Sequence, residues 1–369
     1  MREQIMYTPF SIGKMEVKNR LVASAMFEAG AKNGQVTEKI VERYRQLAEG
    51  GVGLIITGMQ GITASATVAP SMVHTEYTAY EEDMKKLAAI VHAAGCKLIV
   101  QLQHCGSRTL PMDGFDHFSV CETVVSDTQI YHEATQDEIK KVVTDFGKAA
   151  LRCKAAGVDG VQIHSAHGFL LNSFLSPSSN HRTDEYGGDI QNRARFLLEI
   201  YDEVRSKVGN YFIVGIKFPF NDLNTQSISP EDSLYVCREL EQRGIDFIEV
   251  SSGMGPEGGV LSFSPIVKKD AQAPFLKYAE TVANAVSIPV ISVCGYRSPD
   301  VVEKVLSETK ISAISFGRPL VCEPNLPNRW KTNGSAAKCI SCNRCGNSYA
   351  DGIITCQVQK ERLMKSRPN

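Results

Sequence analysis

The sequence predicts an α/β protein, a TIM-type (β/α)8 barrel followed by a short cysteine-rich C-terminal segment. Eight short runs of apolar, β-branched residues recur before residue 330, and segments with helical periodicity separate them. The runs are apolar throughout rather than alternating, as expected of parallel strands that are covered on both faces. After residue 330 the chain becomes rich in Lys, Ser, Asn, Gly and Cys. The alternative that this pattern leaves open is an open, doubly wound sheet.

The expected elements follow one another in strand–helix order. Helical segments at 37–51, 80–95 and 136–157 each end in glycine, the residue that most often terminates a helix. Eight strand–helix units in about 300 residues favour the closed barrel over the open sheet. We therefore expect a barrel domain over residues 1–330 and a separate segment with a tail over 331–369. The expected strands are 20–26, 53–59, 97–103, 160–164, 213–218, 247–252, 289–294 and 313–317.

Composition narrows the class of protein. The chain has 369 residues and a formal net charge of −1, so it has no broad basic field for nucleic acid or anionic lipid, and neither is expected as a partner. No stretch of 18 apolar residues and no signal-peptide run is present, which predicts a cytoplasmic protein. Thiols stay reduced in that compartment, so clustered cysteines indicate metal binding or catalysis rather than disulfides.

Candidate functional residues lie where the expected strands end, because a barrel carries its chemistry at that mouth. His164 ends the fourth strand and His167 follows three residues later. Two imidazoles could bind a metal, donate to an oxyanion or shuttle a proton, but no further metal ligand is near them in this segment. The other candidates at strand ends are Ala25, Met26, Gly58, Gln101, Lys217, Gly295, Gly317 and Arg318.

Four cysteines near the C-terminus have the spacing C-x2-C-x2-C-x10-C. They are Cys339, Cys342, Cys345 and Cys356. Zinc ribbons usually carry two C-x2-C pairs, whereas three close cysteines and a distant fourth are typical of a [4Fe–4S] cluster. The spacing therefore favours iron–sulfur, with zinc as the alternative. The other seven cysteines have no ligand spacing and are expected to be small buried residues.

Several segments, in order and spacing, resemble the Old Yellow Enzyme or NADH:flavin oxidoreductase family of FMN-dependent ene-reductases. They are "NRLVASAM", "VGLIITG", "QLQHCG", "DGVQIHSAHGFLLNSFLSPSSNHRTDEYGG", "SIPVISVCG" and "FGRPLVCEPNLPNRW". The motif "CISCN" is also similar to "CIGCN" of the iron–sulfur subgroup. The chain thus looks like the N-terminal part of 2,4-dienoyl-CoA reductase and 2-enoate reductase, a subgroup that also includes trimethylamine dehydrogenase.

The resemblance implies an FMN site and gives a role to each of its residues. Ala25 and Met26 would pack against the isoalloxazine, Gly58 would lie near the flavin edge, and Gln101 would bind the pyrimidine side. Lys217 would lie beside N1 and O2, where a fixed cation stabilises the reduced flavin. The residues implied at the phosphate are Gly295, Gly317 and Arg318.

The resemblance also implies a reaction. His164 and His167 would bind the carbonyl oxygen of an α,β-unsaturated substrate, an enoate, enone or enoyl-CoA, while hydride passes from flavin N5 to the β-carbon. Phe169 departs from the family, because the usual residue there is a Tyr that protonates the α-carbon. Phe27 is a second departure, at a position where some bacterial members carry a flavin-tuning Cys.

The implied electron path runs through the cluster. In the longer reductases of the subgroup, FAD- and NAD(P)H-binding domains follow the cluster, and the sequence shows no such domain after Cys356. We therefore expect a separate electron-donor protein, such as a flavoprotein dehydrogenase or a ferredoxin, and a homo-oligomer is also compatible with the sequence. One alternative function is an amine dehydrogenase or N-demethylase resembling trimethylamine dehydrogenase. The aromatic cage of that enzyme needs Trp residues, whereas Trp330 is the only Trp in this sequence. Another alternative is a non-catalytic electron-transfer subunit.

Overall fold

The centre of the molecule is a closed barrel of eight parallel strands. The computed structural model describes residues 4–109, 117–126, 129–222, 228–252 and 272–365. Each barrel strand pairs with the next, and the last pairs with the first, which confirms the predicted TIM-type barrel over an open sheet. All eight strands lie within or beside the predicted runs. They are β3 (Leu21–Ala23), β4 (Leu54–Ile56), β6 (Lys97–Gln103), β10 (Gly160–His164), β11 (Ile213–Pro219), β12 (Phe247–Ser251), β13 (Val290–Val293) and β14 (Ala313–Phe316).

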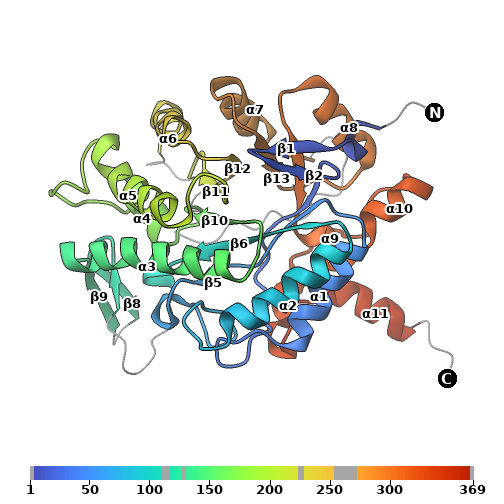
Figure 1. Cartoon of the computed structure of the whole chain (residues 1–369), viewed down its shortest axis with the longest axis horizontal. Helices are drawn as coiled ribbons and strands as arrows, with labels where there is room; N and C mark the ends of the chain where they lie inside the picture. The colour runs from blue at the N-terminus through green and yellow to red at the C-terminus, as the bar shows by residue number, and fades with distance from the viewer. Residues whose placement is uncertain (1–3, 110–116, 127–128, 223–227, 253–271, 366–369) are drawn as a thin grey trace.

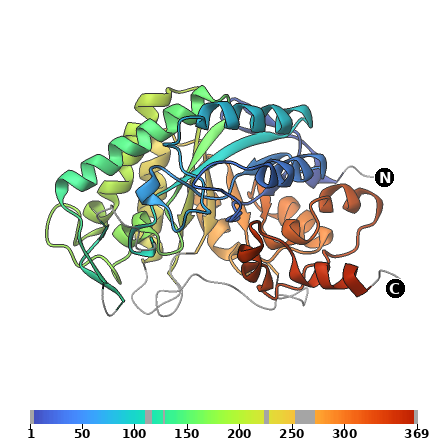
Figure 2. The same cartoon turned by 90° about the horizontal axis from the view of Figure 1, so that it is seen from below.

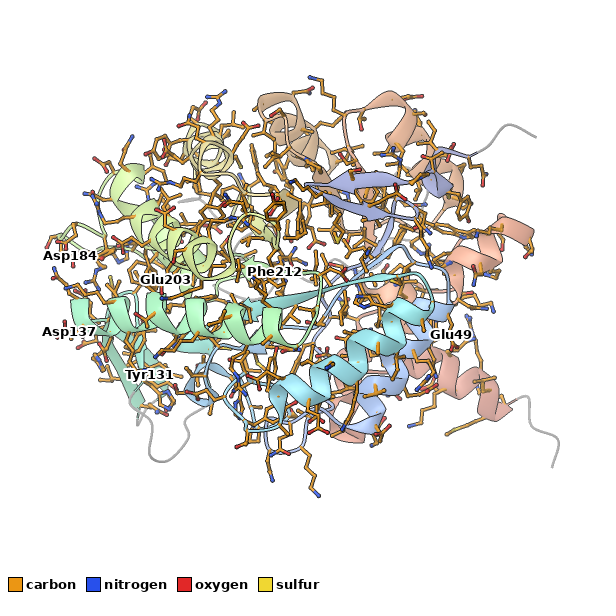
Figure 3. The ribbon with its side chains drawn as sticks, viewed as in Figure 1. Glu49, Tyr131, Asp137, Asp184, Glu203 and Phe212 are labelled. Atoms are coloured by element: carbon orange, nitrogen blue, oxygen red, sulfur yellow. The ribbon has the colours of Figure 1, made fainter. Side chains whose placement is uncertain are left out.

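Helices form the outer layer around the strands (Figure 1). The three helices predicted in detail are present, and local signals explain their ends. Thr135 and Glu138, for example, form a reciprocal capping box at the start of α3. Glu203, labelled in Figure 3, lies where α5 meets α3. The outer helices are α1 (Glu38–Glu49), α2 (Tyr80–Ala93), α3 (Gln136–Ala155), α5 (Ile190–Val208), α6 (Pro230–Gln242), α7 (Leu276–Ala285) and α8 (Pro299–Glu308).

A hairpin that the sequence analysis missed closes the N-terminal end of the barrel. Strands β1 (Phe10–Ile12) and β2 (Met15–Val17) pair antiparallel, and their buried side chains join one apolar cluster with residues inside the barrel such as Ile213 and Phe247. Because this end is filled with apolar side chains, a ligand site has to lie at the opposite mouth. Other short strands are β5 (Gln60–Gly61), β7 (Phe118–Ser119), β8 (Thr123–Ser126) and β9 (Gln129–Glu133).

The C-terminal segment packs beside the N-terminal helices at the end of the barrel where the strands end (Figure 2). The Ile354 N–H donates to the Glu28 carbonyl at 2.7 Å, and Lys39 donates to the Asp351 carbonyl at 3.1 Å. The remaining helices are α4 (Leu170–Leu175), α9 (Arg318–Cys322), α10 (Leu326–Thr332) and α11 (Gln357–Lys365), with 3-10 turns at Ile5–Tyr7, Ala64–Ala66, Gly106–Arg108 and Arg344–Asp351. In the part of the chain that is described, no helix has the length and hydrophobicity needed to cross a bilayer.

Candidate active site

A cavity of about 520 Å³ opens at the C-terminal mouth of the barrel. Its size is in the range of small-molecule and cofactor sites. Residues from many strands and from the C-terminal segment line it, so positions far apart in the sequence meet here. Nine predicted site residues are among its walls: Ala25, Met26, Gln101, His164, His167, Lys217, Gly295, Gly317 and Arg318.

Gly58, the tenth predicted site residue, is not among the lining residues and lies behind Met26. Its N–H donates to the Glu28 carboxylate at 2.9 Å, and a Cβ at this position would come within 2.5 Å of the Met26 carbonyl oxygen. Glu28 is buried, which raises its pKa to about 7. Gly58 therefore supports the cavity wall from behind, and its implied place near the flavin edge stays a prediction.

The two histidines lie side by side at the end of β10. Their ring centroids are 5.1 Å apart and the rings are nearly perpendicular, at 88°. Nδ1 of His164 accepts from the Ala166 N–H at 3.2 Å, so the neutral ring carries its proton on Nε2. Nε2 of His167 lies 2.8 Å from the Ser251 hydroxyl, at the end of β12. Each ring is thus held through one nitrogen, and the other nitrogen can meet a ligand.

Both imidazoles are neutral at physiological pH. Burial, together with the nearby charge of Lys217, lowers the pKa of His167 to about 3. Burial and the charges of His167 and Lys217 move the pKa of His164 well below its usual value. A neutral imidazole donates a hydrogen bond from one nitrogen without carrying charge itself. The pair can therefore donate to a carbonyl oxygen without becoming protonated in the process.

The aromatic wall next to the histidines contains no tyrosine at the usual family position. Phe169 packs edge-on against His164, with ring centroids 5.2 Å apart. Two tyrosines that the sequence analysis did not select line the cavity instead. The Tyr296 hydroxyl pairs with Ser292 at 2.7 Å, while Tyr349 comes from the C-terminal segment and meets Phe27 edge-on at 5.3 Å.

The cavity floor is a buried polar network around Lys217. The Lys217 ammonium lies 3.0 Å from the Ser24 hydroxyl and 3.2 Å from the Glu249 carboxylate. Gln101 donates to Gln162, and Gln162 donates to Glu249. Sequence reasoning missed Glu249, although an acidic residue inside the apolar run "FIEVSS" was a signal that this strand places a charge inside the barrel.

The cavity residues fit FMN in shape and charge. At one end of the cavity two glycines leave the backbone uncovered by side chains. A Cβ on Gly317 would lie 2.7 Å from the Met26 sulfur. Gly295 has a φ angle of +80°, and Cys294 before it has a φ angle of +87°. Arg297 and Arg318 line the same cavity, which suits a phosphate, while Lys217 and Gln101 suit the polar edge of a flavin ring. Aromatic and aliphatic side chains form much of the remaining wall.

The four predicted cluster thiols gather around a second, small cavity. Cys339, Cys342, Cys345 and Cys356 all line it, and Cys345 also lines the larger cavity. Soft thiolates are the ligands that iron–sulfur clusters use. Among the described residues, however, no three His, Cys, Asp or Glu side chains are arranged so that they could hold a metal ion. The iron–sulfur segment therefore stays a prediction.

Two further residues connect to this cysteine loop. Cys322, which has no ligand spacing in sequence, hydrogen-bonds Cys356 and thereby lowers the pKa of the Cys356 thiol to about 6. Arg318 donates to the Ser341 carbonyl at 3.2 Å and to the Asn343 side chain. Arg318 therefore both lines the larger cavity and contacts Ser341 and Asn343 in the cysteine loop. The family resemblance implied a role for Arg318 at a phosphate but not this contact with the cysteine loop.

Residues 5–336 match the NADH:flavin oxidoreductase / NADH oxidase family. The chain belongs to this family. Membership identifies it as a flavin-dependent oxidoreductase and implies FMN as its cofactor. The residues that fit FMN all lie within the matched range.

Three curated relatives are similar over nearly the whole chain. A metal reductase of Desulforamulus reducens is 33% identical and the match covers 97% of this chain and 54% of the relative. An N,N-dimethylglycine/sarcosine dehydrogenase of Chromohalobacter salexigens is 28% identical, covering 96% and 52%. A cinnamate reductase of Clostridium sporogenes is 28% identical, covering 97% and 58%. The chain thus spans about half the length of these relatives, whose names cover both reduction and amine oxidation.

Proposed function

We propose that this family member is an FMN-dependent ene-reductase that reduces the C=C bond of an α,β-unsaturated carbonyl compound. The observation that carries the proposal is the pair of neutral, buried histidines, His164 and His167, in a cavity that also fits FMN. An activated alkene of this kind has one oxygen on which negative charge develops, and the pair offers two donors to a single oxygen.

The protein's own residues would bind the carbonyl and stabilise its charge. Bound FMN would supply the hydride. The Nε2 proton of His164 points to the ligand side, and His167 can donate from Nδ1 if Ser251 donates to its Nε2. As the substrate oxygen becomes an enolate, the two hydrogen bonds strengthen because negative charge builds up on their acceptor. In other enzymes, removal of a single donor of this type lowers kcat by a factor of about 10²–10³.

The proton for the α-carbon has to come from elsewhere than position 169. Phe169 has no proton to give, and its ring packs edge-on against His164. We propose that water or another hydroxyl at the cavity wall supplies the proton. The relative named cinnamate reductase supports an unsaturated acid as the substrate class, since its name describes reduction of such a compound.

We further propose that Cys339, Cys342, Cys345 and Cys356 hold a [4Fe–4S] cluster that passes electrons to the flavin from a separate donor protein. The shared wall at Cys345 supports this arrangement, because it brings the cysteine loop against the flavin cavity. NADH added alone to the isolated protein should then reduce the flavin slowly and without saturation. Fast, saturable reduction by NADH would contradict the need for a donor protein.

Amine oxidation is a second candidate, favoured by the relative named N,N-dimethylglycine/sarcosine dehydrogenase. One anaerobic experiment separates the two functions. The protein is reduced with dithionite and mixed with enones, enoates and enoyl-CoA thioesters, while the oxidised protein is mixed with tertiary amines, and the flavin absorbance is followed. We expect an unsaturated carbonyl compound to reoxidise the flavin. Failure of every alkene, with flavin reduction by an amine, would replace the proposed function by the second candidate.

A further inference from the structure

Beneath Lys217 and Ser24, which line the proposed flavin cavity, lies a carboxylate that the proposed reaction does not use. Glu249 lies at the middle of β12 with its side chain inside the barrel, and it is fully buried. Burying a carboxylate in a barrel interior costs several kcal/mol unless it is paired and hydrogen-bonded. Its presence there calls for an explanation beyond packing, because β12 could fill the same volume with an apolar residue.

Glu249 is ionised and paired. Its carboxylate lies 3.2 Å from the Lys217 ammonium, accepts from Gln162 at 2.9 Å and from Ser24 at 2.8 Å. Burial by itself would raise the pKa of Glu249, but Lys217 and the hydrogen bonds lower it below its usual value. The pair Lys217–Glu249 therefore has no net charge, although Lys217 alone would be a full cation beneath the cavity.

We infer that Glu249 is a positioning residue that offsets the charge of Lys217 and keeps the reduction potential of the bound flavin low. The inference rests on the proposed function, in which Lys217 faces the polar edge of the flavin. An unbalanced cation there would stabilise the reduced, anionic flavin and make it a weaker reductant. Balancing the cation keeps the flavin a strong reductant, which is what a weakly activated alkene requires.

This charge balance selects a substrate class. A carboxylate or thioester group withdraws less electron density from the alkene than a ketone does, so its C=C bond needs a stronger reductant. Glu249 therefore suits the site to enoates or enoyl thioesters rather than enones. Ser24 and Gln162 hold the carboxylate on the Lys217 side, so the pair can persist when the cavity is filled.

The test is the variant Glu249→Gln in the flavin-loaded protein, with sulfite binding and the midpoint potential of the flavin as readouts. Sulfite forms an anionic adduct with oxidised flavin, so its affinity reports how well the site stabilises negative charge. We expect sulfite to bind about tenfold more tightly to the variant, equivalent to a rise of about 30 mV for a two-electron couple. We also expect reoxidation by an enoate to slow more than reoxidation by an enone.

Two comparisons keep the result interpretable. Glu199→Gln removes a half-buried carboxylate of α5 that accepts from the Tyr186 hydroxyl and does not line the cavity, and its sulfite affinity should stay close to that of the parent. The same comparison can be made between the single variant Lys217→Arg and the double variant Lys217→Arg/Glu249→Gln, in which the cation cannot deprotonate. This second pair also tests the inference if Glu249→Gln alone does not accumulate. Unchanged or weaker sulfite binding without Glu249, or an equal shift in Glu199→Gln, would overturn the inference. If instead the protein binds no flavin, or if no alkene reoxidises the reduced flavin, the proposed function is overturned.

Discussion

The position of His167 depends on an uncommon backbone conformation. Its φ angle is +63°, in the left-handed region that residues with a side chain seldom adopt. Such a conformation costs roughly 1–2 kcal/mol, and the contact of His167 with Ser251 helps to hold it. The turn after β10 thus brings the two imidazoles, which only Ser165 and Ala166 separate in the chain, side by side at the wall of one cavity.

Removal of either imidazole should weaken the binding of ligands that mimic the carbonyl oxygen. We expect His164→Ala and His167→Ala to bind phenolic ligands at least about tenfold more weakly and to lower the rate of alkene reduction by about 10²-fold each. The charge-transfer absorbance of the flavin with a phenol measures the first effect. His92→Gln is the matched control, because His92 pairs with Asp159 at the start of β10 and is remote from the mouth. An unchanged phenol affinity in His164→Ala would contradict the assigned role.

At the scale of elements, the C-terminal segment contributes to two cavities at once. Its cysteines line the small cavity, while Tyr349 and Cys345 line the larger cavity at the barrel mouth. Gly30 fits closely under it, since a Cβ there would lie 2.7 Å from Ile353. The segment is therefore part of the active-site wall, and its loss would open the cavity as well as remove the thiols.

The proposed cluster predicts a specific effect of changing one thiol. Cys342→Ser should lose most of the iron and acid-labile sulfide from protein purified without oxygen, because a [4Fe–4S] cluster uses one thiolate at each iron. Cys121→Ser is the matched control, since Cys121 is also half-buried but lies far along the chain from the cysteine loop. Equal metal content in Cys342→Ser and the parent would refute the ligand assignment. Retained zinc in place of iron would support the zinc alternative.

The sequence predicted the features that depend on local patterns and missed those that depend on residues far apart in the chain. The eight strands were predictable because buried parallel strands are apolar throughout, and their ends brought His164 and Lys217 to one mouth. Glu249, Tyr349 and Cys322 were missed because their roles depend on neighbours more than 30 residues away, which spacing along the chain does not encode. The place of Gly58 at the flavin edge stays a prediction, because the structure shows only that this residue lies behind Met26 and does not line the cavity.

At the scale of the whole molecule, buried neutral histidines link the fold to pH. Burial lowers the pKa of His104 to about 4 and that of His167 to about 3, against about 6.5 when unfolded. Below pH 6.5 the unfolded chain therefore binds protons that the folded chain excludes, and stability falls as the pH decreases toward these values. Glu28 has the opposite effect, because its pKa is raised in the folded protein from 4.5 to about 7. Its contribution to stability therefore increases as the pH falls through this range.

The contribution of one histidine can be isolated. We expect the free energy of unfolding to fall between pH 6.5 and 4, and His167→Asn to reduce that slope by up to about 1.4 kcal/mol per pH unit, the value for one proton. Urea unfolding at several pH values measures the slope in both proteins. Parallel slopes in the variant and the parent would mean that His167 is not held neutral by the fold.

The contacts that dock the C-terminal segment have a consequence for how the protein matures. Ile354 bonds to Glu28, and Asp351 to Lys39, so each contact joins residues more than 300 positions apart. During synthesis the first helices leave the ribosome long before their partners exist. These docking contacts can form only after residues 351–354 have been synthesised. We therefore expect delivery of a metal to the proposed cluster thiols to be a late step in the maturation of the protein, after the segment has docked against Glu28 and Lys39.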